Sequence, residues 1–169
     1  FRLDKFSLVN RKNESVFSLQ GGIDLSTLTI DTLIAVADNL PLDEIARGLT
    51  GKDSSSFGGR FNMLANLSGR LPYPDVNINA HLAAAYYHIV TGVWANLHIV
   101  TEESLYVLQG CELGLELKNI AHAEGSYNRI SKEYEISARS TEHDIKDFIR
   151  LITGRAGFIS GLSLLRANF

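Results

Sequence analysis

The sequence predicts an α+β fold in which a curved antiparallel sheet wraps around one long buried helix. The helix is predicted from residues 77–98, the longest apolar stretch of the chain. One side of this stretch carries large apolar residues three or four positions apart, namely Leu82, Tyr86, Ile89, Val93 and Leu97. Another side carries small residues that allow a sheet to come close, namely Ala84, Ala85, Gly92 and Ala95. Because a helix that is apolar nearly all round is normally covered by other structure, we expect one buried helix over 80–97.

The sheet is predicted from a change to period-two alternation after this stretch. Leucines alternate with charged residues in 112–120, and apolar and charged residues alternate again in 130–140. Such alternation is typical of antiparallel strands with one solvent-exposed face. A last hairpin is expected on either side of a turn at Gly154, although 145–152 also fits a helical period.

Shorter elements are expected before the long helix. They are strands at 5–9 and 15–19, helices at 26–40 and 41–49, and a strand at 60–67. A chain of 169 residues fits one domain. We divide it into N-terminal strands and short helices, residues 1–58, and a core formed by 59–169.

Composition excludes several classes of protein. The net charge of −3 argues against a nucleic-acid binder, which usually has a basic surplus. Three histidines and three asparagines within 77–98 argue against a membrane span. Cys111 is the single cysteine, so no disulfide forms within the chain and a reducing compartment is expected. With no leader pattern visible, the predicted location is cytoplasmic.

The familiar motifs of enzyme chemistry are absent from the sequence. It has no G-x-S-x-G, no Walker A motif, no H-E-x-x-H and no paired cysteine ligands. His81 and His88 would lie about 10.5 Å apart along the predicted helix, too far to bind one metal ion together. We therefore expect no metal and no cofactor.

Two stretches nevertheless resemble a known family. GGRFNMLANLSGRLPYPDVNINAHL and GFISGLSLLRAN make residues 59–169 similar to the hot-dog-fold acyl thioesterases of the FcoT type, which act on long-chain fatty acyl-CoA. The resemblance implies a hot-dog fold, a homo-oligomer and a thioester substrate carried by CoA or by an acyl-carrier protein. It also implies a site residue at Asn79, with Tyr73 as the nearest candidate for a preceding tyrosine. A second helix asparagine of the family falls near His88 here, which departs from the pattern.

The candidate catalytic residues are Tyr73, Asp75, Asn79 and His81, at the start of the predicted helix. Unpaired N–H groups at a helix N-terminus would stabilise the oxyanion of a thioester, and Asp75 or His81 would activate water. Four further residues are candidates for substrate binding, namely Asn77, Ala83, Ala84 and His88. The competing interpretation is structural: Asn77 or Asn79 caps the helix and Asp75 complements its dipole.

Three functional classes are compatible with the sequence. The first is a protein that hydrolyses or binds an acyl-CoA or acyl-carrier-protein thioester. The second is a hot-dog dehydratase, disfavoured because residues 80–98 contain no carboxylate. The third is a non-catalytic oligomeric structural or ligand-binding module. The apolar segment 157–166 would form an exposed edge strand, so we expect a homodimer or a multiple of it.

Overall fold

The computed structural model describes residues 2–10, 14–50, 57–87, 90–140, 143–144, 162–163 and 166–168. Strands dominate these residues, and one helix, α1 (Leu42–Thr50), lies among them. The strands before and after α1 are β1 (Arg2–Asn10), β2 (Ser15–Asp24), β3 (Thr29–Pro41), β4 (Phe57–Arg70), β5 (Asp75–Tyr87), β6 (Val90–Glu102), β7 (Leu105–Leu115), β8 (Lys118–Asn128) and β9 (Tyr134–Ser140). Three short strands follow, namely β10 (His143–Asp144), β11 (Leu162–Ser163) and β12 (Arg166–Asn168).

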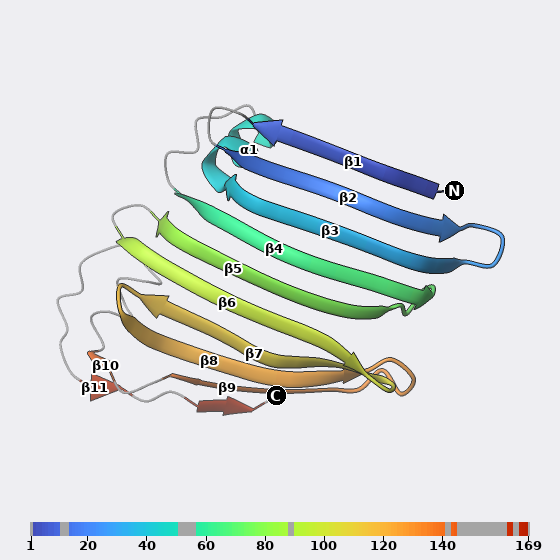
Figure 1. Ribbon diagram of the computed structural model, residues 1–169. Helices are drawn as coiled ribbons and strands as arrows, with labels where there is room; N and C mark the ends of the chain where they lie inside the picture. Colours follow the sequence, from blue (N-terminus) through green and yellow to red (C-terminus); the bar gives the residue numbers. More distant parts are fainter. Residues whose placement is uncertain are drawn as a thin grey trace.

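The sheet is an antiparallel meander. Strands β1 to β9 lie side by side in chain order and β12 pairs with β9, while β10 and β11 form a separate pair. Figure 1 shows that the large sheet is curved and that α1 lies at one end of it, near β1 to β4. The described helix is too short to cross a membrane.

The prediction of a long buried helix is wrong. Residues 77–87 belong to β5 and residues 90–98 to β6, and these strands pair antiparallel, with Asn79 opposite His98 and His81 opposite Asn96. The hot-dog layout therefore does not describe this chain. The physical reason is visible in residues 77–82, where Asn, Ile, Asn, Ala, His and Leu alternate with the period of a strand. The helical spacing of the apolar residues from Leu82 to Leu97 arises because β5 and β6 both contribute apolar residues to this stretch.

Some of the other predicted elements are confirmed and others are wrong. The short helix at 41–49 is confirmed as α1, and strands at 5–9, 15–19 and 60–67 lie within β1, β2 and β4. The helix at 26–40 is wrong, since most of it is β3. The strand at 112–120 is divided by a turn between β7 and β8, and the strand at 130–140 begins only at Tyr134. The predicted hairpin around Gly154 falls largely outside the described residues.

Alternation divides the sheet into an apolar face and a polar face. The apolar face has two continuous rows of residues that are paired directly from strand to strand. The first is Leu8, Phe17, Ala37, Met63, Ala80, Leu97, Cys111, Ala123 and Ala138. The second is Phe6, Leu19, Ala35, Ala65, Ile78, Ile99, Leu108, Gly125 and Ile136. We call these two rows the apolar rows.

The best-packed part of the described structure lies at one end of the apolar face. Its buried residues come from β5 to β8 and are Ala85, Val90, Val93, Leu115 and Ile120. Leu82 and Leu113 pack against them. By contrast, Ala37 and Ala65 are the buried members of the apolar rows, and the others are half-buried or exposed.

Local polar contacts support the turns between strands. In the β2–β3 turn, Asp24 accepts hydrogen bonds from the hydroxyl and the backbone N–H of Ser26 at 2.7 and 2.9 Å. The side-chain hydrogen bond from Ser26, followed by one from Thr27, lowers the pKa of Asp24 to about 2. In α1, Asp43 and Glu44 lie in the first turn, where negative charge complements the helix dipole.

Gly92 provides a test of the hairpin. Its φ is +76°, and a Cβ there would lie 3.3 Å from Cγ of Glu116. Gly92→Ala is therefore expected to lower the free energy of unfolding by about 1–2 kcal/mol, measured by urea denaturation. Gly110→Ala is the control, because nothing lies within 4 Å of its added Cβ, and it should change stability by less than about 0.5 kcal/mol. Equal losses in both variants would contradict the strain at Gly92.

Candidate functional site

A row of polar residues crosses the polar face of the sheet. From β4 to β9, its members are Asn62, His81, Asn96, Glu112, His122 and Arg139. Each is paired directly with the next, so neighbouring Cβ atoms are about 4.5–5.5 Å apart. We call this set the polar row. It exists because the same alternation that directs leucines and alanines to one face directs these side chains to the other.

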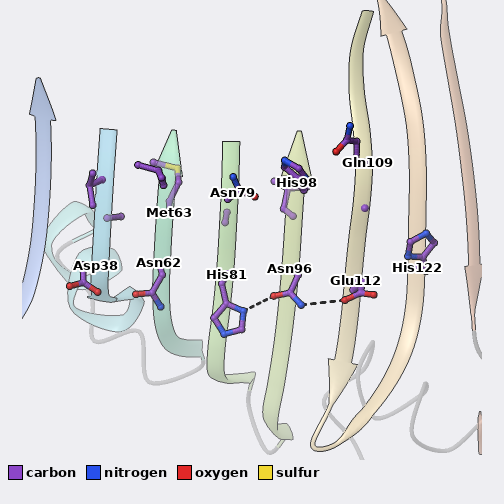
Figure 2. A pocket seen from close by; sticks show the side chains of 16 residues that line it. Asp38, Asn62, Met63, Asn79, His81, Asn96, His98, Gln109, Glu112 and His122 are labelled. Carbon is purple, nitrogen blue, oxygen red and sulfur yellow. Dashed lines mark hydrogen bonds between the residues drawn. The ribbon is translucent and has the colours of Figure 1, made fainter. Parts of the chain in front are cut away.

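Hydrogen bonds join the centre of the polar row. His81 Nδ1 lies 2.6 Å from Oδ1 of Asn96, and Asn96 Nδ2 donates to Oε2 of Glu112 at 3.3 Å. Figure 2 shows these three side chains lying in line across β5, β6 and β7. An amide oxygen only accepts, so His81 donates from Nδ1. In neutral His81, Nε2 is then the acceptor.

The members of the polar row from Asn62 to His122 line a broad cavity of about 730 Å³ over β3 to β8, and Arg139 lies outside that lining. The ionised groups in its lining are two carboxylates, Asp38 and Glu112, and neither lysine nor arginine is among them. The other lining residues are the amides and imidazoles of Asn62, Asn79, His81, Asn96, His98, Gln109 and His122, together with the apolar residues Val36, Ala37, Met63, Leu64, Ala80, Leu97 and Gly110. Figure 2 shows these side chains standing out from neighbouring strands toward the same space. The described residues hold no cluster of His, Cys, Asp and Glu that suits a metal ion.

Four of the predicted site residues lie together on one face of β5. Asp75, Asn77, Asn79 and His81 alternate along this strand and are exposed, and Asn79 Nδ2 donates to Oδ1 of Asn77 at 3.2 Å. Asn79 and His81 line the cavity. None of them opens a helix, so the predicted oxyanion site at a helix N-terminus has no counterpart here.

The other predicted site residues are placed elsewhere. Ala83 and Ala84 lie in the irregular part of β5, where Ala84 has a φ of +47° and the register with β6 shifts. Tyr73 lies in the β4–β5 turn, with Nζ of Lys132 3.6 Å from its ring centroid. His88 lies outside the described residues.

Arg129 ties Asp75 and Tyr73 into a structural cluster. Its guanidinium lies 3.0 Å from Oδ1 of Asp75, donates to the carbonyl of Tyr73 at 2.8 Å, and also donates to the carbonyl of Glu103. It lies over the ring of Tyr106, 5.5 Å from the centroid. These contacts join the β4–β5, β6–β7 and β8–β9 turns, so we assign Asp75 a role in stability.

Sequence reasoning missed Asn96 and Glu112, the hydrogen-bonded partners of His81, as well as His98 and Gln109. The signal was present in the segments NINAH and ANLH, where polar residues occupy alternate positions. Recognising two adjacent strands there would have placed Asn96 beside His81.

Comparison with known proteins adds no assignment, since no family model, curated protein or solved structure matches the chain.

Proposed function

We propose that this protein is a non-catalytic ligand-binding module that holds acyl chains on the apolar face of its sheet. The observation that carries this proposal is the pair of apolar rows, which run across β1 to β9 without a charged residue. At the usual spacing between strands, nine strands extend for about 38 Å. Phe6, Leu8 and Ile136 are exposed and most other members are half-buried, so apolar surface stays open to solvent along the rows, and a large open apolar surface normally marks a binding site.

The shape of the face favours a narrow, flexible ligand. Along β5, the polar-face residues Asn77, Asn79 and His81 are exposed, whereas Ile78 and Ala80 between them are half-buried. Side chains that shield one another in this way are expected on the inner side of a curved sheet, and Figure 1 shows that the sheet is curved. A narrow, flexible acyl chain can lie along these half-buried apolar rows.

The arrangement of the two faces argues against hydrolysis of a thioester. His81 is the best candidate base because Asn96 orients its ring, but it lies on the polar face. Ala80 and Leu82, its neighbours in β5, point to the apolar face. An acyl chain held on the apolar rows would therefore keep its thioester carbonyl on the opposite side of the sheet from His81.

Binding can be measured through Cys111, the single cysteine, which lies in the first apolar row and is half-buried. Palmitate and palmitoyl-CoA are expected to slow the alkylation of Cys111 by a maleimide in a saturable manner, while CoA alone leaves the rate unchanged. If palmitate and palmitoyl-CoA do not protect Cys111 from alkylation at concentrations below their critical micelle concentrations, the proposal is refuted.

The same samples distinguish binding from catalysis. Palmitoyl-CoA incubated with catalytic amounts of protein should release no CoA, measured by chromatography so that the protein thiol does not interfere. Sustained release of CoA that is lost in His81→Ala would instead support the thioesterase hypothesis. The predicted homodimer stays a prediction, because 157–166 lies largely outside the described residues, and sedimentation would test it.

A further inference from the structure

We infer that the polar face carries a second binding site, for a neutral oligosaccharide, built from Trp94 and the part of the polar row between Asn62 and His122. Trp94 lies on the same face as Asn96, two residues away along β6, and is paired directly with Gly114. Its ring occupies the space above Gly114, where an added Cβ would lie 2.0 Å from the indole. The indole therefore lies against β7 at Gly114, two residues from Glu112 on the same face.

The orientation of the indole is fixed from a second direction. Trp94 Nε1 donates to the backbone carbonyl of Glu116 at 3.0 Å. Because its N–H is already bonded and the side chain is half-buried rather than buried, the exposed part of the indole can serve as an apolar platform, next to the cavity that Asn96 lines. A pyranose ring has an apolar C–H face that can lie on such a platform, with hydroxyl groups at its edge.

The groups beside the platform suit those hydroxyls. Asn96 is held by His81 and by Glu112, so its amide is oriented before a ligand arrives. Glu112 Oε1 and the Nε2 of neutral His81 are acceptors, and Nδ2 of Asn62 is a donor. A hydroxyl group is both donor and acceptor, which matches a site that offers both.

The charges of the cavity narrow the class of ligand. Its lining contains carboxylates but neither lysine nor arginine, which disfavours phosphates and other anions. An organic cation is the main competitor, since indole rings and carboxylates both attract cations. Amides and imidazoles outnumber the two carboxylates in the lining, which favours the neutral ligand, and Asp38, the second carboxylate, is exposed and lies four strands away from Glu112. From Asn62 on β4 to His122 on β8 the polar row extends for about 19 Å, which suits a chain of several sugar units.

Trp94 is the single tryptophan of the chain, so its emission reports on this site alone. Titration with neutral hexose oligomers of three to six units, including malto-, cello- and chito-oligosaccharides, is expected to shift Trp94 emission saturably for at least one of them. The shift should persist with palmitate bound, because the acyl chain occupies the other face. No shift with any oligosaccharide, or a shift with spermidine alone, would overturn the inference.

Variants distinguish specific recognition from nonspecific binding, with the affinity for the oligosaccharide measured by calorimetry. Glu112→Gln is expected to weaken binding about ten-fold, because it weakens a charge-assisted acceptor without changing the shape of the side chain. Trp94→Phe keeps a ring over Gly114 but reduces the platform, and it should weaken binding by a similar factor. Glu14→Gln, in the exposed β1–β2 turn, is the matched control and should bind as the wild type does. Unchanged affinity in both Glu112→Gln and Trp94→Phe would refute the site.

Discussion

Ala80→Trp is expected to weaken acyl-chain binding by at least ten-fold. Ala80 is half-buried in the first apolar row, between Met63 and Leu97 on the neighbouring strands. A tryptophan there would fill the space above these residues, where the acyl chain is proposed to lie. Tryptophan is accepted in strands, so the sheet should persist, which circular dichroism can verify. The rate of Cys111 alkylation with and without palmitate measures the loss of protection.

The adjacent residue offers a matched control for this experiment. Asn79→Trp places the same side chain one residue earlier in β5, and therefore on the opposite face of the sheet. This variant should retain the protection of Cys111 by palmitate, although it alters the polar cavity. Equal loss of protection in both variants would show that the effect does not depend on the face, and it would contradict the assignment of the acyl site to the apolar rows.

Ile120→Ala should have the largest effect on stability among simple truncations. Ile120 is 1% exposed and belongs to the cluster of buried residues at the end of β5 to β8. Removing its outer carbons loses burial and leaves a cavity, which together cost about 2–5 kcal/mol of unfolding free energy. Urea denaturation monitored by Trp94 emission gives this difference directly.

Ile130→Ala makes the same chemical change at an exposed position. Ile130 lies in the β8–β9 turn and is 79% exposed, so its truncation should change the unfolding free energy by less than about 0.5 kcal/mol. If Ile120→Ala proves equally mild, the cluster around Val90 and Leu115 would not be the stabilising core that its burial indicates.

The candidate site was predictable from the sequence only in part. Asn77, Asn79 and His81 stand out in the sequence as polar residues in an apolar setting, and the structure places all three on one polar face. The sequence pattern assigned them to a helix N-terminus. The predicted oxyanion site depended on the free N–H groups of that helix, and these residues lie in a strand instead. The partners Asn96 and Glu112 come from other strands, and their contact with His81 depends on register.

The sequence by itself determined the local elements in which hydrophobic period and flanking residues indicate the same secondary structure. The short helix α1 follows Pro41 and has acidic residues in its first turn, and the alternation within 112–115 and 134–138 matches β7 and β9. Residues 77–98 fitted both the helical and the strand period, because apolar residues from two adjacent strands, β5 and β6, also satisfy a helical spacing over part of this stretch. Only tertiary structure decided between them. Strands inside the sheet gain backbone hydrogen bonds on both edges from their neighbours, and pairing aligns the alternating residues of nine strands into one apolar and one polar face, an arrangement that no single segment specifies.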